Sequence, residues 1–134
     1  METFGLNKRE PREAALLPMN VLAYIGDSVY ELYIRTHVIN NYKANANRLH
    51  KATVKHVSAA AQAKSVKHLL DNELLDERES QIVRRGRNCR VTSMPKNADL
   101  TEYRYATAFE CLIGYLYISN QVDRIKEIID EIVL

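Results

Sequence analysis

The 134-residue chain lacks the features that anchor proteins in membranes, cross-link them or bind zinc. Its N-terminus has no apolar segment, and no apolar run approaches the roughly 18 residues of a membrane-spanning helix. Its two cysteines, Cys89 and Cys111, do not form a CxxC pair, so we expect reduced thiols and no disulfide. His50 and His56 do not have the spacing of zinc ligands. These absences predict a soluble, cytoplasmic protein.

Motifs for covalent catalysis are absent as well. No serine lies in a GxSxG context, no glycine-rich segment resembles a P-loop, and neither cysteine has a histidine beside it in the sequence. The sequence therefore gives no support for nucleophilic catalysis by a side chain.

Helical periodicity covers most of the chain, whereas no alternating β-branched run is long enough to build a sheet. No internal repeat or linker divides the sequence, so we expect one all-α domain spanning residues 1–134. The predicted helices cover residues 18–39, 44–54, 57–72, 76–85, 100–118 and 122–134, with a long irregular segment at 86–98.

Acidic residues are missing from two long basic stretches, although the net charge is only +2. The stretches span residues 32–70 and 84–98, and this segregation favours a polyanionic partner. For the first stretch alone, an ordinary solvated helix face is an equally good interpretation. The candidate polyanion contacts are Arg48, Lys51, Lys55, Arg84, Arg85, Arg87, Arg90 and Lys96.

Two carboxylates stand alone in helical patterns that are apolar on nearly every side. Asp27 follows Gly26, and Glu110 precedes Gly114 by one turn. A glycine inside a helix costs about 1 kcal/mol relative to alanine, and a desolvated, unpaired carboxylate costs several more. A divalent cation shared by both carboxylates is the simplest way to offset this cost, and it would also give the carboxylates a function. Such a site requires that the glycines let the two helices approach closely. The alternative is that Glu110 pairs with an arginine such as Arg104, and Asp27 with a lysine.

The helical projection of residues 18–39 assigns Asp27 to a partly enclosed stripe. On this helix Asn20 lies in register with Asp27 and can offer an amide oxygen, while Glu31 is expected to pair with Arg35. On the second helix Thr107 precedes Glu110 by one turn and offers a hydroxyl. The opposite stripe of residues 18–39 is predicted to face the core and contains Val21, Ile25, Ser28, Val29 and Leu32.

Three segments together resemble a known enzyme family. They are Leu22-Ala-Tyr-Ile-Gly-Asp27-Ser-Val-Tyr-Glu31, the stretch from Tyr103 to Tyr117 around Glu110, and Arg85-Gly-Arg-Asn88 with Ser93-Met-Pro-Lys96. They resemble the catalytic domain of ribonuclease III, and most closely its small bacterial form, mini-ribonuclease III, which lacks a double-stranded-RNA-binding domain. The resemblance covers nearly the whole chain.

This resemblance implies a ribonuclease III endonuclease-domain-like helical bundle that forms a homodimer. It implies a Mg²⁺-dependent endoribonuclease, in which Mn²⁺ can substitute, that hydrolyses double-stranded RNA. It further implies trimming of the ends of precursor 23S (large-subunit) ribosomal RNA, with a ribosomal protein presenting the substrate.

The metal-binding acids of the family match this sequence only in part. Asp27 and Glu110 match its two central acids, whereas Ala23, Thr107 and Asn20 stand where the family has further carboxylates. The resemblance therefore implies one Mg²⁺ held mainly by Asp27 and Glu110, with Asn20 and Thr107 as neutral neighbours. Two other interpretations stay open: a double-stranded-RNA-binding dimer with weak or no catalysis, and a purely structural helical dimer.

Overall fold

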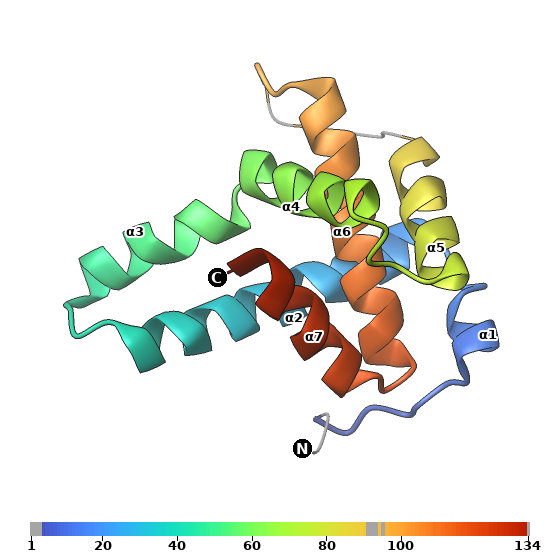
Figure 1. Cartoon of the computed structure of the whole chain (residues 1–134), viewed down its shortest axis with the longest axis horizontal. Coiled ribbons are helices and arrows are strands. Elements are labelled where there is room, and N and C mark those ends of the chain that lie inside the picture. The colour runs from blue at the N-terminus through green and yellow to red at the C-terminus, as the bar shows by residue number, and fades with distance from the viewer. Residues whose placement is uncertain (1–3, 91–93, 95, 134) are drawn as a thin grey trace.

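Helices account for all of the regular structure in the part of the chain that the computed structural model describes, residues 4–90, 94 and 96–133 (Figure 1). The prediction of an all-α protein is confirmed. The helices are α1 (Pro11–Ala14), α2 (Met19–Asn41), α3 (Ala46–Val57), α4 (Ala59–Asp71), α5 (Glu77–Asn88), α6 (Leu100–Ile118) and α7 (Val122–Val133).

Four of the helices begin at a side chain that caps their free backbone N–H groups. The caps are Asn45 for α3, Ser58 for α4, Asp76 for α5 and Asp99 for α6. Each side chain accepts a hydrogen bond from the backbone three residues later, which stabilises the first turn. These short polar residues therefore set the helix boundaries.

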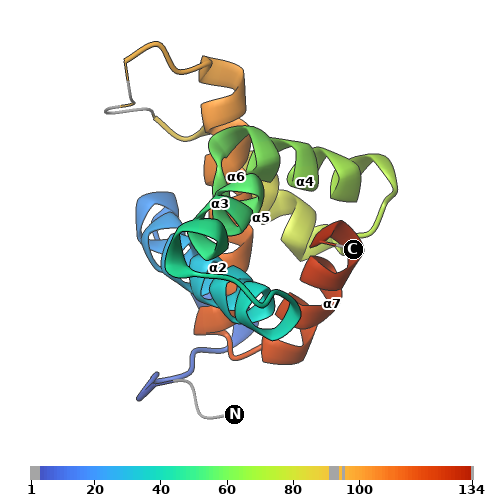
Figure 2. The same cartoon turned by 90° about the vertical axis from the view of Figure 1, so that its left-hand side faces the viewer.

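Helix α6 is the centre of the fold and packs against α2, α4 and α5 (Figures 1 and 2). Its residues Phe109, Leu112, Ile113 and Leu116 are completely buried. Phe109 meets Tyr30 of α2 edge to face, with ring centroids 4.8 Å apart. The buried residues of α6 lie between Ala106 and Tyr117 and on all sides of the helix, which explains why this part of α6 is apolar all round.

Helices α2 and α6 touch through their backbones at two glycines. A Cβ atom on Gly26 would collide with the Glu110 carbonyl and come within 2.8 Å of the Gly114 nitrogen, and one on Gly114 would collide with the Leu22 carbonyl. The expectation that Gly26 and Gly114 permit a close helix crossing is confirmed. No other residue type fits at either position without moving the helices apart.

The predicted core face of α2 is wrong in part: Ile25 and Val29 are half-buried against the core, but the fully buried residues lie on another face. The buried face consists of Met19, Leu22, Gly26, Tyr30, Ile34 and Val38. Of the predicted core residues, Val21 is 43% exposed, Leu32 is 51% exposed, and Ser28 is also exposed. Because both faces carry apolar residues, hydrophobicity alone does not distinguish the face that packs on α6 from the face left open.

The boundary of α5 also differs from the prediction. The helix continues through Gly86 to Asn88, because Gly86 packs against α6, where an added Cβ would lie 2.9 Å from the Cα of Ala108. Helix α5 therefore extends further toward its C-terminal end than expected. The short helix α1 was not predicted.

Cys89 and Cys111 are free thiols, and the buried Cys111 donates its S–H to the Met19 carbonyl at 3.2 Å. Among the described residues, no helix has the combined length and apolar character needed to span a bilayer.

Candidate active site

The crossing of α2 and α6 brings Asp27 and Glu110 together. Glu110 is half-buried beside the Gly26–Gly114 contact, and its carboxyl lies close enough to Asp27 to share a hydrogen bond when one of the two is protonated. Asp27 itself is exposed, so the expectation of a partly enclosed position for it is wrong. The pair therefore has one carboxyl held in the fold and one open to solvent.

The pKa of Glu110 shows that this arrangement is unfavourable for two negative charges. Burial is the main cause of a rise to about 8 from the ordinary value of 4.5, and the nearby charge of Asp27 adds to it. Without a compensating cation, Glu110 therefore holds a proton at neutral pH.

The alternative of ordinary ion pairs is not observed. Among the residues that the structure describes, neither Asp27 nor Glu110 forms a salt bridge, so no pair between Glu110 and Arg104 is present. The expected pair of Glu31 and Arg35 is confirmed, with a nitrogen–oxygen distance of 3.2 Å. Asp27 is the charged group that raises the pKa of Glu110 in addition to burial.

The donor set suits a hard divalent cation. Mg²⁺ prefers oxygen ligands, keeps several waters and is commonly bound by one or two carboxylates together with substrate phosphates. Two carboxylates on closely packed helices meet that requirement. Within the described part of the chain, no cluster of three or more His, Cys, Asp or Glu side chains could hold a metal by itself.

Asn20 and Thr107 lie on the same two helices as the carboxylates. Asn20 is exposed in the first turn of α2, and Thr107 is half-buried on α6. In the described region neither side chain forms a hydrogen bond with Asp27 or Glu110. Their assignment as neutral neighbours of a metal stays a prediction.

Gln62 of α4 is a residue of this site that the sequence reasoning missed. Its side chain is only 2% exposed, and its polar amide lowers the pKa of Glu110, although less than burial raises it. Gln62 lies on the same face of α4 as Val66 and Leu69, which are both completely buried. It is therefore a polar residue on an apolar helix face. That irregularity was the available sequence signal.

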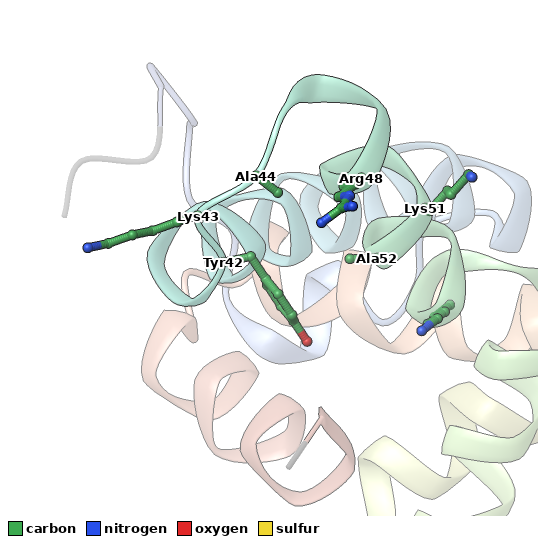
Figure 3. Close-up of a pocket in the computed structure, with 7 residues that line it drawn as sticks. Tyr42, Lys43, Ala44, Arg48, Lys51 and Ala52 are labelled. Carbon is green, nitrogen blue, oxygen red and sulfur yellow. The ribbon is translucent and has the colours of Figure 1, made fainter.

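The predicted cations of α3 form an exposed cluster. Arg48, Lys51 and Lys55 line a shallow cavity of about 300 Å³ at the turn between α2 and α3, together with Tyr42, Lys43, Ala44 and Ala52. Figure 3 shows Lys43 and Lys51 extending outward on opposite sides of it. No acidic side chain lines this cavity, so the cluster presents positive charge to solvent.

The candidate cations of the second basic stretch lie partly on α5. Arg84, Arg85 and Arg87 belong to its last two turns, while Arg90 and Lys96 are exposed beyond it. Ser93 and Pro95 of the loop motif lie outside the described residues. Arg87 was expected in the irregular segment 86–98, and this expectation is wrong because α5 does not stop at Gly86.

Two of these arginines also have partners within the fold. Arg85 donates to the Ala15 carbonyl at 2.6 Å, and the Arg87 guanidinium lies 5.8 Å from the ring centroid of Tyr105. Lys67 approaches the same ring at 4.7 Å. Arg85 and Arg87 consequently contribute to packing, whatever else they bind.

Comparison with known proteins agrees with this geometry. The family model of the Ribonuclease III domain matches residues 20–121. The chain is 52% identical over 110 residues to Mini-ribonuclease 3 of Thermoanaerobacter sp. (strain X514), covering 82% of this chain and 76% of the relative. It is 33% identical over 128 residues to Mini-ribonuclease 3 of Staphylococcus aureus (strain NCTC 8325 / PS 47), covering 96% of each.

A solved structure supports the fold directly. The crystal structure of protein FN1578 from Fusobacterium nucleatum superimposes with a TM-score of 0.74 at 31% identity. The match covers 84% of this chain and 88% of that chain. The helical arrangement around α6 is therefore shared with a solved structure.

Proposed function

The chain belongs to the ribonuclease III family and is an endoribonuclease, and we propose that it cleaves double-stranded RNA with Mg²⁺ held by Asp27 and Glu110. The observation that carries the metal assignment is the convergence of these two carboxyls across the glycine contact of α2 and α6. Mn²⁺ would substitute, since it also takes oxygen ligands.

The two acids have different tasks in this proposal. Glu110 is fixed by the buried helix α6, while the exposed Asp27 lies where a polymeric substrate can reach it. When bound, the cation would polarise a phosphate oxygen and lower the pKa of the attacking water. Asp27 and Glu110 would hold the cation together with water and RNA phosphate.

Binding of the duplex would rely on shape and charge. A-form RNA hides its base edges in a deep, narrow groove, so proteins contact its phosphates and 2′-hydroxyls. The exposed cations of α3, together with Arg84, Arg90 and Lys96, offer such phosphate contacts. Contacts of this kind position a duplex without reading its sequence.

The natural substrate we propose is precursor large-subunit ribosomal RNA, presented by a ribosomal protein. The support is the similarity to relatives named Mini-ribonuclease 3 and the resemblance of the sequence motifs to that form. A precursor duplex that is cut faster with a bound ribosomal protein than without one would support this assignment. Equal rates would remove the presenting protein from the proposal.

A homodimer is the second part of the proposal. The open face of α2 exposes Val21, Tyr24 (81% exposed) and Leu32, and the neighbouring Leu16 is also exposed. A second copy of the chain placed on this face by a twofold axis would bury all four residues twice. Such a dimer would also bring two carboxylate pairs into one particle.

The central test is charge removal at the carboxylates. Asp27→Asn and Glu110→Gln should each reduce Mg²⁺-dependent cleavage of a duplex RNA by about 100-fold or more, because loss of a metal ligand removes the ion's contribution. Binding of the duplex without Mg²⁺ should remain. The matched control is Glu31→Gln, one turn from Asp27, whose side chain pairs with Arg35.

Near-normal turnover in either variant would remove that acid from the mechanism. Duplex binding by the wild type without any cleavage in Mg²⁺ or Mn²⁺ would instead support a non-catalytic RNA-binding protein.

A further inference from the structure

The cavity at the turn between α2 and α3 combines two features that a phosphate contact alone does not need. Its lining includes four cationic side chains, yet most of its surface is apolar. Tyr42 supplies an aromatic ring that is 50% exposed, and Ala52 lines the cavity with it. In Figure 3 the Arg48 side chain points toward Tyr42, whereas Lys43 and Lys51 extend away from it. The cavity therefore has an apolar interior and a positively charged rim.

The cations of this cavity have no anionic partner in the fold. Among the described residues, Lys43, Arg48, Lys51 and Lys55 form no ion pair. Residues 32–70 contain no acid, so the neighbouring sequence does not supply one either. Like charges gathered around one cavity repel each other, and a bound anion removes that cost. The arrangement therefore favours an anionic ligand.

The turn that carries Tyr42 is held in place by hydrogen bonds. The Tyr42 backbone N–H donates to the Val38 carbonyl at 2.9 Å, which fixes the end of α2. The Asn45 side chain caps α3 by accepting from the Arg48 backbone N–H at 3.0 Å. The ring and the cations are thus attached to ordered backbone on both sides of the cavity. A site formed before its ligand arrives loses less entropy on binding.

A nucleotide combines the two groups that this cavity suits. Nucleobases stack on aromatic side chains, while phosphates bind to arginine and lysine. A duplex offers its phosphates but no free base face, because its bases are paired and stacked on one another. An unpaired nucleotide offers both groups at once. The cavity volume of about 300 Å³ lies at the small end of ligand sites, which fits one nucleotide rather than a longer strand.

We propose that this cavity binds one unpaired nucleotide, with its base on the Tyr42 ring and its phosphate at Arg48 and Lys55. The nucleotide is either the single-stranded end of an RNA substrate, in which case the inference rests on the proposed function, or a free nucleotide. Tyr42 follows Asp27 by 15 residues along α2 and its C-terminal cap, which is about 22 Å of helix. The site is therefore separate from the carboxylate pair.

The test is Tyr42→Leu, which removes the ring and keeps an apolar side chain. The probes are duplex RNAs with three unpaired nucleotides at the 3′ ends or the 5′ ends, and a blunt duplex of the same paired length. Fluorescence anisotropy in EDTA measures their affinities without cleavage. We expect the wild type to bind one overhang duplex at least about 5-fold more tightly than the blunt one, since loss of a base–aromatic stack costs about 5- to 150-fold. In Tyr42→Leu this ratio should fall to about 1.

Three further variants make the result specific. Tyr42→Phe keeps the ring and should keep the overhang preference, so it is the matched control. Asp27→Asn should also keep the preference, because the cavity is separate from the carboxylate pair. Arg48→Ala should reduce the preference, and it serves as the test variant if Tyr42→Leu does not fold.

Free adenosine diphosphate distinguishes the two sources of the nucleotide. Calorimetric binding that is lost in Tyr42→Leu would assign the cavity to free nucleotides, whereas an overhang preference without such binding would assign it to RNA ends.

Equal affinities for overhang and blunt RNAs, together with no binding of adenosine diphosphate, would overturn the inference. So would an overhang preference or nucleotide binding that persists in Tyr42→Leu. A wild type that shows the Tyr42-dependent preference but cleaves no RNA would instead overturn the proposed function alone, which separates the two results.

Discussion

At the scale of single residues, Glu110 makes the metal-free protein sensitive to pH. Its pKa of about 8 in the folded state lies above the ordinary 4.5, chiefly because of burial, so the folded protein binds this proton more tightly than the unfolded chain. The stabilisation is complete below the unfolded pKa and is lost as pH rises through the folded pKa. Metal-free protein should therefore become less stable between these two values.

Glu110→Gln should remove most of this dependence. We expect the metal-free variant to melt a few degrees higher than the wild type at about pH 9, and the difference to shrink toward about pH 5. Thermal unfolding in EDTA across that range measures it. Saturating Mg²⁺ should stabilise the wild type but not the variant, and parallel pH profiles of the two metal-free proteins would contradict the assignment.

At the scale of helices, Gly26 holds the two acids at their spacing. Gly26→Ala would normally stabilise a helix interior by about 1 kcal/mol. Here the new Cβ meets the Glu110 carbonyl and lies 2.8 Å from the Gly114 nitrogen, so we expect destabilisation of about 1–3 kcal/mol or more, with loss of cleavage. Chemical denaturation shows directly whether the free energy of unfolding falls or rises in the variant. A more stable variant would show that the helices are not in backbone contact.

The cations of α3 should contribute to RNA affinity through phosphates. Replacing Arg48, Lys51 and Lys55 with alanine should weaken duplex binding and lower the log–log salt slope by up to about 0.9 per lost contact on the B-DNA scale, with duplex RNA taken as comparable. Fluorescence anisotropy at several salt concentrations measures the slope.

Asp27→Asn is the control for this experiment, since it should leave the slope nearly unchanged. If the α3 triple variant keeps the wild-type slope, α3 is a solvated face and the duplex is held elsewhere. Arg84→Ala with Arg90→Ala then tests the end of α5. Arg85 and Arg87 are left intact because they also contact Ala15 and Tyr105.

The sequence identified both carboxylates and most helices, but not the faces of α2. Isolated acids in apolar patterns are conspicuous, whereas α2 is apolar on both its buried and its open face, so its periodicity gives no direction. Asp27 was assigned to the wrong environment for this reason. The identity of the packed face depends on Gly26 meeting Gly114, a contact across 88 residues of sequence.

Two other features depended on tertiary contacts in the same way. A glycine at position 86 suggested the end of a helix. In the structure, its missing side chain instead lets α5 pack closely against Ala108 of α6. Gln62 was visible as a polar residue on the apolar face of α4, but its effect on the pKa of Glu110 depends on how α4 packs against α6. Neither neighbour could be deduced from local sequence.

At the scale of the whole molecule, we expect a dimer of twice the 15.4 kDa chain in sedimentation at micromolar concentration. Tyr24→Glu combined with Leu32→Glu should shift it to monomer, because four carboxylates would be buried across a twofold interface. Val54→Glu, at an exposed apolar residue of α3, is the control and should leave the dimer intact. A wild type that sediments only as a monomer would contradict the expectation.

Helix α2 has its core face on α6 and its open apolar face on the other side, and Asp27 lies between them along the same two turns. In the proposed dimer, helix α2 would therefore connect the interface directly to the active site. Diluting the enzyme below its dimer dissociation constant should lower the rate per chain, so that turnover rises more steeply than in proportion to protein concentration. The monomer–dimer equilibrium would then act as a threshold on how much enzyme is needed before any RNA is cut efficiently.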